Sequence, residues 1–86
     1  MSTYTCRAVC VPEEEGGYSA FVRNLPGVHS QGESLDEALN NIREAFAGTV
    51  AAYLAAGEEI PWDNDAALPE GAIERQMALQ SLNFLA

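Results

Sequence analysis

This chain of 86 residues contains side chains of the types that carry out acid–base or nucleophilic chemistry, but their spacing does not match a catalytic pattern. The one histidine, His29, stands between Val28 and Ser30 without a carboxylate at a local spacing that would orient it as a general base. The serines lack the strained strand-to-helix turn that exposes a catalytic nucleophile, and Gly16-Gly17 is too short and too acidic in its surroundings to bind phosphate. We therefore expect no enzymatic activity and no cofactor.

The densest group of carboxylates is the run Glu13-Glu14-Glu15. Consecutive carboxylates in a strand or loop point in different directions, and no further ligand is fixed nearby in the sequence. The run is therefore a poor metal or acid–base site. Two interpretations stay open for it: a solvated loop, or a contact for a protein partner.

The two cysteines, Cys6 and Cys10, stand four residues apart in an apparent strand. At roughly 3.3 Å per residue their Cα atoms would be about 13 Å apart, whereas a disulfide needs less than about 7 Å. Two cysteines and His29 alone are a weak pattern for a metal site. The sequence predicts free, buried thiols in a reducing compartment and no bound metal.

Charge is the strongest compositional signal, because 13 carboxylates face four arginines and no lysine, for a net charge of -9. Such a field repels nucleic-acid backbones and attracts basic proteins. The alternative is that the acidity only keeps the fold soluble. The apolar runs are too short to span a bilayer, and the first residues lack the layout of a signal peptide. We expect a cytoplasmic protein that contacts neither nucleic acid nor membrane directly.

The first third of the chain has the pattern of three strands. Side chains alternate over Tyr4–Pro12, a glycine-containing acidic segment interrupts them, and the alternation resumes over Tyr18–Arg23, which predicts a β-hairpin with an acidic tip. Pro26-Gly27 suits the centre of a turn, and Val28–Gln31 can form a short third strand.

A long amphipathic helix follows from Ser34 to Gly57. Ser34 and Glu37 form a capping box, and Gly57 is placed to end the helix. Gly48 costs about 1 kcal/mol in a helix interior, so the sequence favours either close approach of the sheet or of another helix, or a kink at this point. The apolar positions at helical spacing are Leu35, Ala38, Leu39, Ile42, Ala45, Phe46, Thr49, Val50, Tyr53 and Leu54.

The predicted helix is followed by Glu58-Glu59-Ile60-Pro61 and then by Trp62, the only tryptophan. It can act as a lid over the fold or as an exposed anchor for another protein. An acidic linker over residues 63–71 comes next. Residues 72–86 fit either a helix or one more strand, and the residues themselves do not decide between them.

Taken together, these segments resemble the HicB-like antitoxins, over about residues 4 to 62. The resemblance implies a partial RNase H-like fold, β-β-β-α and a further strand at Ile73–Leu79, which neutralises a small basic HicA-type mRNA-cleaving toxin by covering it. Residues after Trp62 are too few for the DNA-binding domain of full-length relatives, so we expect the short form. The matching motifs are Glu14-Glu15-Gly16-Gly17-Tyr18-Ser19-Ala20, Leu25-Pro26-Gly27, Ser30-Gln31-Gly32, Leu35-Asp36-Glu37-Ala38, Asn41-Ile42-Arg43-Glu44-Ala45 and Gly57-Glu58-Glu59-Ile60-Pro61.

The prediction for the fold is an α+β domain with an antiparallel sheet of three to four strands and one long helix on one face. Residues 1–62 would form the HicB-like β-β-β-α unit, and residues 63–86 a linker and C-terminal segment of the same domain. We expect a homodimer or homotetramer, formed through a second apolar sheet face (Val9, Val11 and Phe21) or the small-residue helix flank (Ala45, Gly48, Ala52 and Ala55).

The predicted function is an antitoxin-like module that occludes a toxin by shape and charge. The alternative is an orphan structural or small-ligand-binding oligomer of the same fold without a toxin partner. The candidate partner-binding residues are Glu13, Glu14, Glu15, Tyr18, Glu58, Glu59, Trp62, Asp63 and Asp65.

Overall fold

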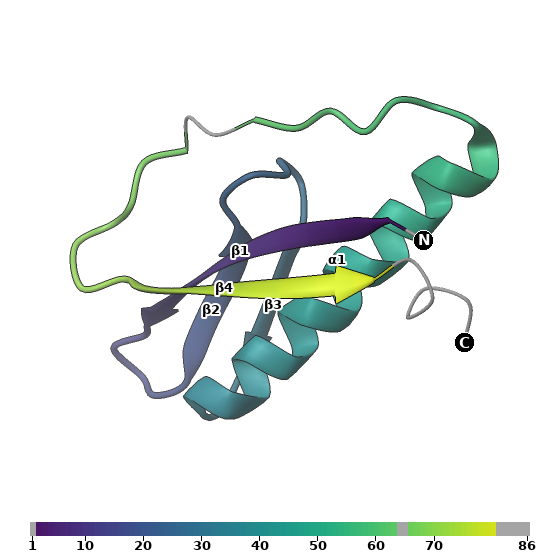
Figure 1. Cartoon of the computed structure of the whole chain (residues 1–86). Helices are drawn as coiled ribbons and strands as arrows, with labels where there is room; N and C mark the ends of the chain where they lie inside the picture. Colours follow the sequence, from purple (N-terminus) through teal and green to yellow (C-terminus); the bar gives the residue numbers. More distant parts are fainter. Residues whose placement is uncertain (1, 64–65, 81–86) are drawn as a thin grey trace.

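The computed structural model describes residues 2–63 and 66–80 of the chain. Its elements follow the order β-β-β-α-β, as predicted, in one antiparallel sheet with one helix on one face (Figure 1). The elements are β1 (Thr3–Pro12), β2 (Tyr18–Val22), β3 (His29–Gly32), α1 (Leu35–Ala56) and β4 (Ile73–Gln80).

The strand order in the sheet is β3-β2-β1-β4, so the last strand of the chain lies beside the first. β1, β2 and β3 are neighbours in the sheet because short hairpin connections join them. Gly16 and Gly17 turn the β1–β2 loop with positive φ angles of 101° and 76°, and Gly27 does the same between β2 and β3 with a φ of 88°. The predicted hairpin and Pro-Gly turn are therefore confirmed.

β4 decides the ambiguity over the C-terminal segment. Residues of intrinsic helix preference form a strand here because each of them pairs with β1, in a register that places Met77 opposite Cys6 and Leu79 opposite Tyr4. The strand implied by the family resemblance at Ile73–Leu79 is present and is one residue longer. Residues 81–86 of this segment lie outside the described residues.

The helix has the predicted limits. The Ser34 hydroxyl accepts a hydrogen bond from the Glu37 amide at 3.1 Å, and Gly57 ends the helix with a left-handed φ of 68°. Glu37 Oε1 accepts from the amide of Glu33 at 3.4 Å, one residue before the position that a capping box predicts.

Two of the explanations considered for Gly48, an approach of the sheet and a kink that divides the helix, are wrong. The helix is continuous through Gly48 over 22 residues. A Cβ atom at Gly48 would meet no atom of the described chain within 4 Å, so neither a kink nor a close approach within the chain accounts for this glycine.

The core lies between the sheet and α1, which packs on β3, β2 and β1 (Figure 1). β1, β2 and β4 contribute the side chains of one face, because successive residues of a strand point to opposite sides. The helix contributes positions four residues apart, a stripe at helical period. The fully or nearly buried members are Cys6, Ala8, Cys10, Ala20, Val22, Leu25, Val28, Ala38, Ile42, Phe46, Val50 and Leu79.

The opposite face of the sheet is less open than predicted. Val9 is completely buried, whereas Val11 and Phe21 are half-buried. Val9 pairs with Glu74 on β4, and Glu74 forms ion pairs with Arg7 at 3.2 Å and with Arg23 at 3.4 Å. Val9 is therefore not available to a second molecule, and the predicted apolar docking face is reduced to its margin.

Candidate protein-binding surfaces

The hairpin loop presents two carboxylates toward the start of the helix. Glu13 closes the loop through its backbone, because its amide donates to the Gly17 carbonyl and its carbonyl accepts from the Gly16 amide, both at 3.0 Å. Within this loop Glu13 and Glu15 line a hollow in the surface, whereas Glu14 is exposed but is not part of its lining. The three consecutive carboxylates thus diverge, as the sequence predicted.

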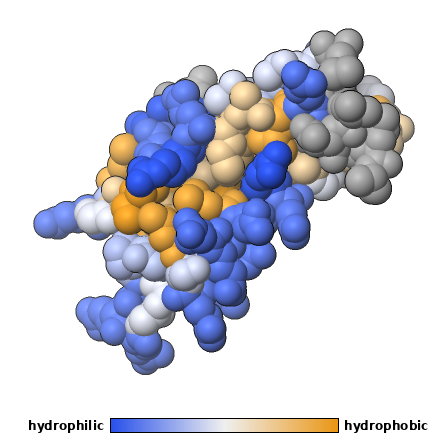
Figure 2. All heavy atoms as spheres, turned by 60° about the horizontal axis from the view of Figure 1, so that its bottom comes forward, coloured by the Kyte–Doolittle hydropathy of each residue, from blue (hydrophilic) through white to orange (hydrophobic). Residues whose placement is uncertain are grey.

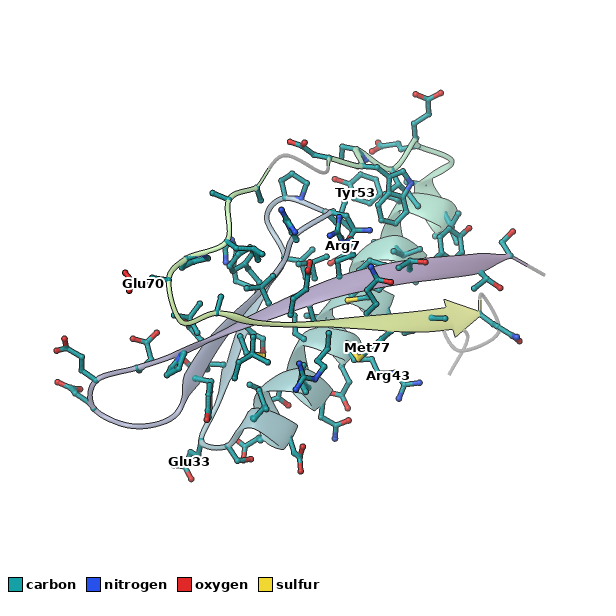
Figure 3. All side chains as sticks on the ribbon, turned by 60° about the vertical axis from the view of Figure 1, so that its left-hand side comes forward. Arg7, Glu33, Arg43, Tyr53, Glu70 and Met77 are labelled. Atoms are coloured by element: carbon teal, nitrogen blue, oxygen red, sulfur yellow. The ribbon has the colours of Figure 1, made fainter. Side chains whose placement is uncertain are left out.

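The other wall of this hollow comes from β3 and the first turn of α1. β2 and β3 pair with Tyr18 opposite Gly32, which brings the residues after Gly32 to the tip of the hairpin. Glu33 and Glu37 are thereby placed across from Glu13 and Glu15, and Glu33 lies at the hairpin end of the molecule in Figure 3.

We call this feature the acidic hollow; its volume is about 740 Å³. Every charged side chain that lines it is a carboxylate, and mutual repulsion among them is relieved by a cationic group from outside. Its chemistry therefore favours lysine and arginine side chains of another protein. The lining residues are Glu13, Glu15, Gly16, Gly17, Tyr18, Ser19, Gln31, Gly32, Glu33, Glu37 and Asn41.

The second group of predicted contact residues lies in the segment that follows α1. Trp62 stacks on Tyr4 with ring centroids 6.3 Å apart and packs at a tilt on Phe46 at 6.0 Å. Because Phe46 is fully buried and Trp62 remains 43% exposed, the indole covers the core on one side and faces solvent on the other. Trp62 therefore has the features of a lid and still offers surface to a partner.

Glu58 and Glu59 are exposed just after the helix, and the Asp63 amide donates to the Asn24 carbonyl at 3.1 Å. Glu58 also borders a largely apolar groove along the outer side of α1. The small side chains of the helix flank form this groove together with Tyr53, and its lining is Ala45, Gly48, Thr49, Ala52, Tyr53 and Glu58.

Eight of the nine predicted contact residues lie among the described residues, and they fall into two groups. Glu13, Glu15 and Tyr18 meet in the acidic hollow, with Glu14 beside it. Glu58, Glu59, Trp62 and Asp63 lie in the segment after α1, where Trp62 packs on Phe46 in the middle of the helix and the Asp63 amide bonds to the Asn24 carbonyl. Asp65 lies outside the described residues.

The sequence analysis missed Glu33 and Glu37 as surface charges of the same hollow. Glu37 was interpreted only as a helix cap. The signal that could have found both is the pairing of β2 with β3 around the Pro26-Gly27 turn, because that pairing returns the start of the helix to the hairpin tip.

The described side chains that could bind a metal or act as nucleophiles do not cluster into a site. In residues 2–63 and 66–80, no three His, Cys, Asp or Glu side chains lie where they could share a metal ion. Cys6 and Cys10 are free and buried, as predicted, and burial raises the pKa of the Cys6 thiol from 9.0 to about 12. A thiol of that pKa is a poor nucleophile at neutral pH. His29 is exposed on β3.

Comparison with known proteins identifies the family. The model of the HicB-like antitoxins of bacterial toxin–antitoxin systems matches residues 7–77, most of the chain. The chain belongs to the HicB-like antitoxin family. Both surfaces described above lie within the matched residues.

Relatives and solved structures agree with this assignment. A UPF0150 protein of Synechocystis is 36% identical over 58 residues, which cover 67% of this chain and 73% of that protein. An uncharacterized 14.9 kDa protein of Haemophilus phage HP1 is 34% identical over 56 residues, 65% of this chain and 42% of the phage protein.

The fold of this HicB-like chain is that of a HicB N-terminal domain. The crystal structure of the Burkholderia pseudomallei antitoxin HicB superimposes with a TM-score of 0.76 and 28% identity, covering 96% of this chain and 67% of that one. Its N-terminal domain alone gives a TM-score of 0.73 at 27% identity and is covered to 99%. The described residues form no helix with both the length and the hydropathy of a membrane span.

Proposed function

We propose that this protein is a cytoplasmic antitoxin that binds a small basic HicA-type mRNA-cleaving toxin and blocks it by covering its active surface, without itself catalysing a reaction. Family membership supports the antitoxin role. The observation that carries the mode of binding is the acidic hollow, which collects four carboxylates from two distant segments and no cationic side chain.

The hollow is suited to a basic partner for an electrostatic reason. Complementary charge accelerates encounter and sets orientation, and its effect weakens as salt screens it. Tyr18, half-buried in the lining, supplies an aromatic surface beside the carboxylates. We propose the hollow as the primary contact and the exposed residues Glu58, Glu59, Trp62 and Asp63 as a second one.

We further propose that residues 1–62 form the HicB-like β-β-β-α unit, while residues 63–86 are a linker and C-terminal segment that complete the same domain. The pairing of β4 with β1 supports this division, because the strand after the linker adds to the same sheet.

The test is co-expression with a short basic HicA-type protein, followed by affinity purification at low and high salt. The test variant carries Glu13→Gln and Glu15→Gln, in the hollow. The matched control carries Glu44→Gln and Glu70→Gln, which removes the same charge from exposed positions outside the hollow.

We expect the hollow variant to weaken toxin binding by roughly tenfold, about 1.4 kcal/mol, and the control to stay within about twofold. Growth rescue from the toxin should follow the same order. Equal effects of the two variants would assign the binding to net charge rather than to the hollow. Failure to retain the basic protein even at low salt would contradict the proposed function.

A further inference from the structure

The outer edge of β4 is an unprotected sheet edge. β4 pairs with β1 on one side, and none of the other described strands pairs with it on the other. An edge strand presents a row of N–H and C=O groups, and proteins usually blunt it with proline, lysine, a bulge or a short strand. β4 has eight residues, contains neither proline nor lysine, and pairs with β1 without interruption.

The other edge of the sheet is protected, which makes the contrast informative. β3 has only four residues. The side-chain amide of Asn41 on α1 donates to the Gln31 carbonyl at 2.8 Å, and so occupies a backbone acceptor of this strand. Gly32 lies against the backbone of Ala38 in the helix. Among the described residues, α1 therefore covers the β3 edge, and no strand pairs with the outer edge of β4.

A groove lined by both polar and apolar side chains runs beside this edge, because α1 packs on β1, β2 and β3 and leaves β4 partly uncovered. We call it the β4 groove; its volume is about 480 Å³. Leu39 from the helix and Met77 from β4 are half-buried in it, and Figure 3 shows Met77 and Arg43 on this side. On the face of the molecule that Figure 2 shows, hydrophobic side chains form a band bordered by hydrophilic ones.

Charge indicates which partner fits this surface. The edge and groove carry Asp36 and Glu74 against Arg43 and Arg75, so their charges balance although the whole chain carries -9. A basic toxin gains no attraction here, in contrast to the acidic hollow. A second copy of the chain meets no net repulsion.

We propose that β4 pairs antiparallel with β4 of a second copy about a two-fold axis, joining the two four-stranded sheets into one. The β4 grooves of the two copies then meet on the helix side of the joined sheet. This inference goes beyond the antitoxin role and does not depend on it, because the acidic hollow shares none of its lining residues with the β4 groove.

The residues of β4 restrict the register. Directly opposite residues of an antiparallel pair share one face of the sheet, so the axis passes beside one residue of each strand. An axis at Glu74 or Arg75 places like charges opposite each other, which destabilises a sheet. An axis at Met77 pairs Met77 with its copy on the side of the groove and leaves no like charges opposed. We assign the axis to Met77.

The experiment measures the mass of the full chain in solution by sedimentation equilibrium. We expect twice the chain mass of 9.2 kDa for the unaltered protein, or four times with a further contact. Met77→Arg, which opposes two cations at the axis, should halve the mass and shift the dimer dissociation constant at least 100-fold. Leu54→Arg, an equally drastic change at an exposed leucine elsewhere on α1, should leave the mass unchanged.

A second measurement covers the case in which Met77→Arg does not fold. Under mild oxidation Met77→Cys should form an interchain disulfide, whereas Leu54→Cys and the unaltered chain with its buried thiols should not. A monomeric mass at all concentrations up to the millimolar range would overturn the proposal. So would a dimer that Met77→Arg leaves intact, or the absence of the Met77→Cys crosslink.

Discussion

Gly32 at the end of β3 lies so close to Ala38 in α1 that a Cβ atom on Gly32 would be 2.8 Å from the Ala38 Cα atom. No side chain fits between this strand and this helix. The contact directs the chain from the sheet onto the helix and holds Glu33 and Glu37 next to the hairpin tip. The acidic hollow depends on it.

Gly32→Ala should therefore lower the free energy of unfolding by about 3 kcal/mol, because the backbone of α1 has to move away. Urea denaturation measures the loss. Gly48→Ala is the matched control: its Cβ meets no described atom within 4 Å, and the change should raise stability by about 1 kcal/mol. Equal effects at the two glycines would contradict the close contact.

Asn24 is a buried polar residue that joins β1 to the loop after β2. Its side-chain amide donates to the Thr5 carbonyl at 2.8 Å, and its side-chain oxygen accepts from the Arg7 amide at 3.1 Å. Asn24→Ala leaves both backbone groups unpaired and should cost about 2–3 kcal/mol in urea denaturation. Asn40→Ala, at an exposed helix position, should change stability by less than about 0.5 kcal/mol. A loss at Asn24 no larger than that at Asn40 would argue against this network.

Trp62 should contribute to stability as a lid. Trp62→Ala removes the contacts with Tyr4 and Phe46 and should cost about 2 kcal/mol, measured as a lower melting temperature. Leu68→Ala is a suitable comparison because Leu68 is 45% exposed, close to the 43% of Trp62. It should cost less than about 1 kcal/mol. If Trp62→Ala leaves the melting temperature unchanged, the indole serves only as surface for a partner.

The buried thiols should make the fold sensitive to alkali. Burial raises the pKa of Cys6 from 9.0 to about 12, and desolvation also raises that of Cys10, against a smaller opposing effect of Arg75. Below pH 9 both thiols are protonated in the folded and the unfolded chain, so they add no pH dependence. Between about pH 9 and pH 12 the unfolded chain loses the protons first, and stability should fall as pH rises.

Thermal denaturation at a series of pH values checks this expectation, and Cys6→Ser with Cys10→Ser tests its cause. Removal of the thiols should flatten the decline above pH 9 even if it lowers stability overall. In the unaltered protein, a thiol reagent at neutral pH should react only at the rate of unfolding. Rapid modification of the folded chain would disagree with burial of these side chains.

Local signals in the sequence determined most of the elements. The alternation in β1 and β2, the turn glycines, and the caps at Ser34 and Gly57 act within a few residues of where they stand, so they can be interpreted without the rest of the chain. The long helix, the hairpin and the free thiols were all predicted for this reason. The acidic hairpin tip was predicted as well, as a loop with diverging carboxylates.

The tertiary structure alone decided what depends on distant segments meeting. Residues 73–80 favour a helix by themselves and become a strand because β1 offers them an unpaired edge. Val9 is apolar on the outer face of the sheet but is buried, since the ion pairs of Glu74 lie beside it. Glu33 and Glu37 join the acidic hollow because the pairing of β2 with β3 carries them there. Pairing across the sheet is not encoded at any local spacing, so only the folded chain determines these surfaces.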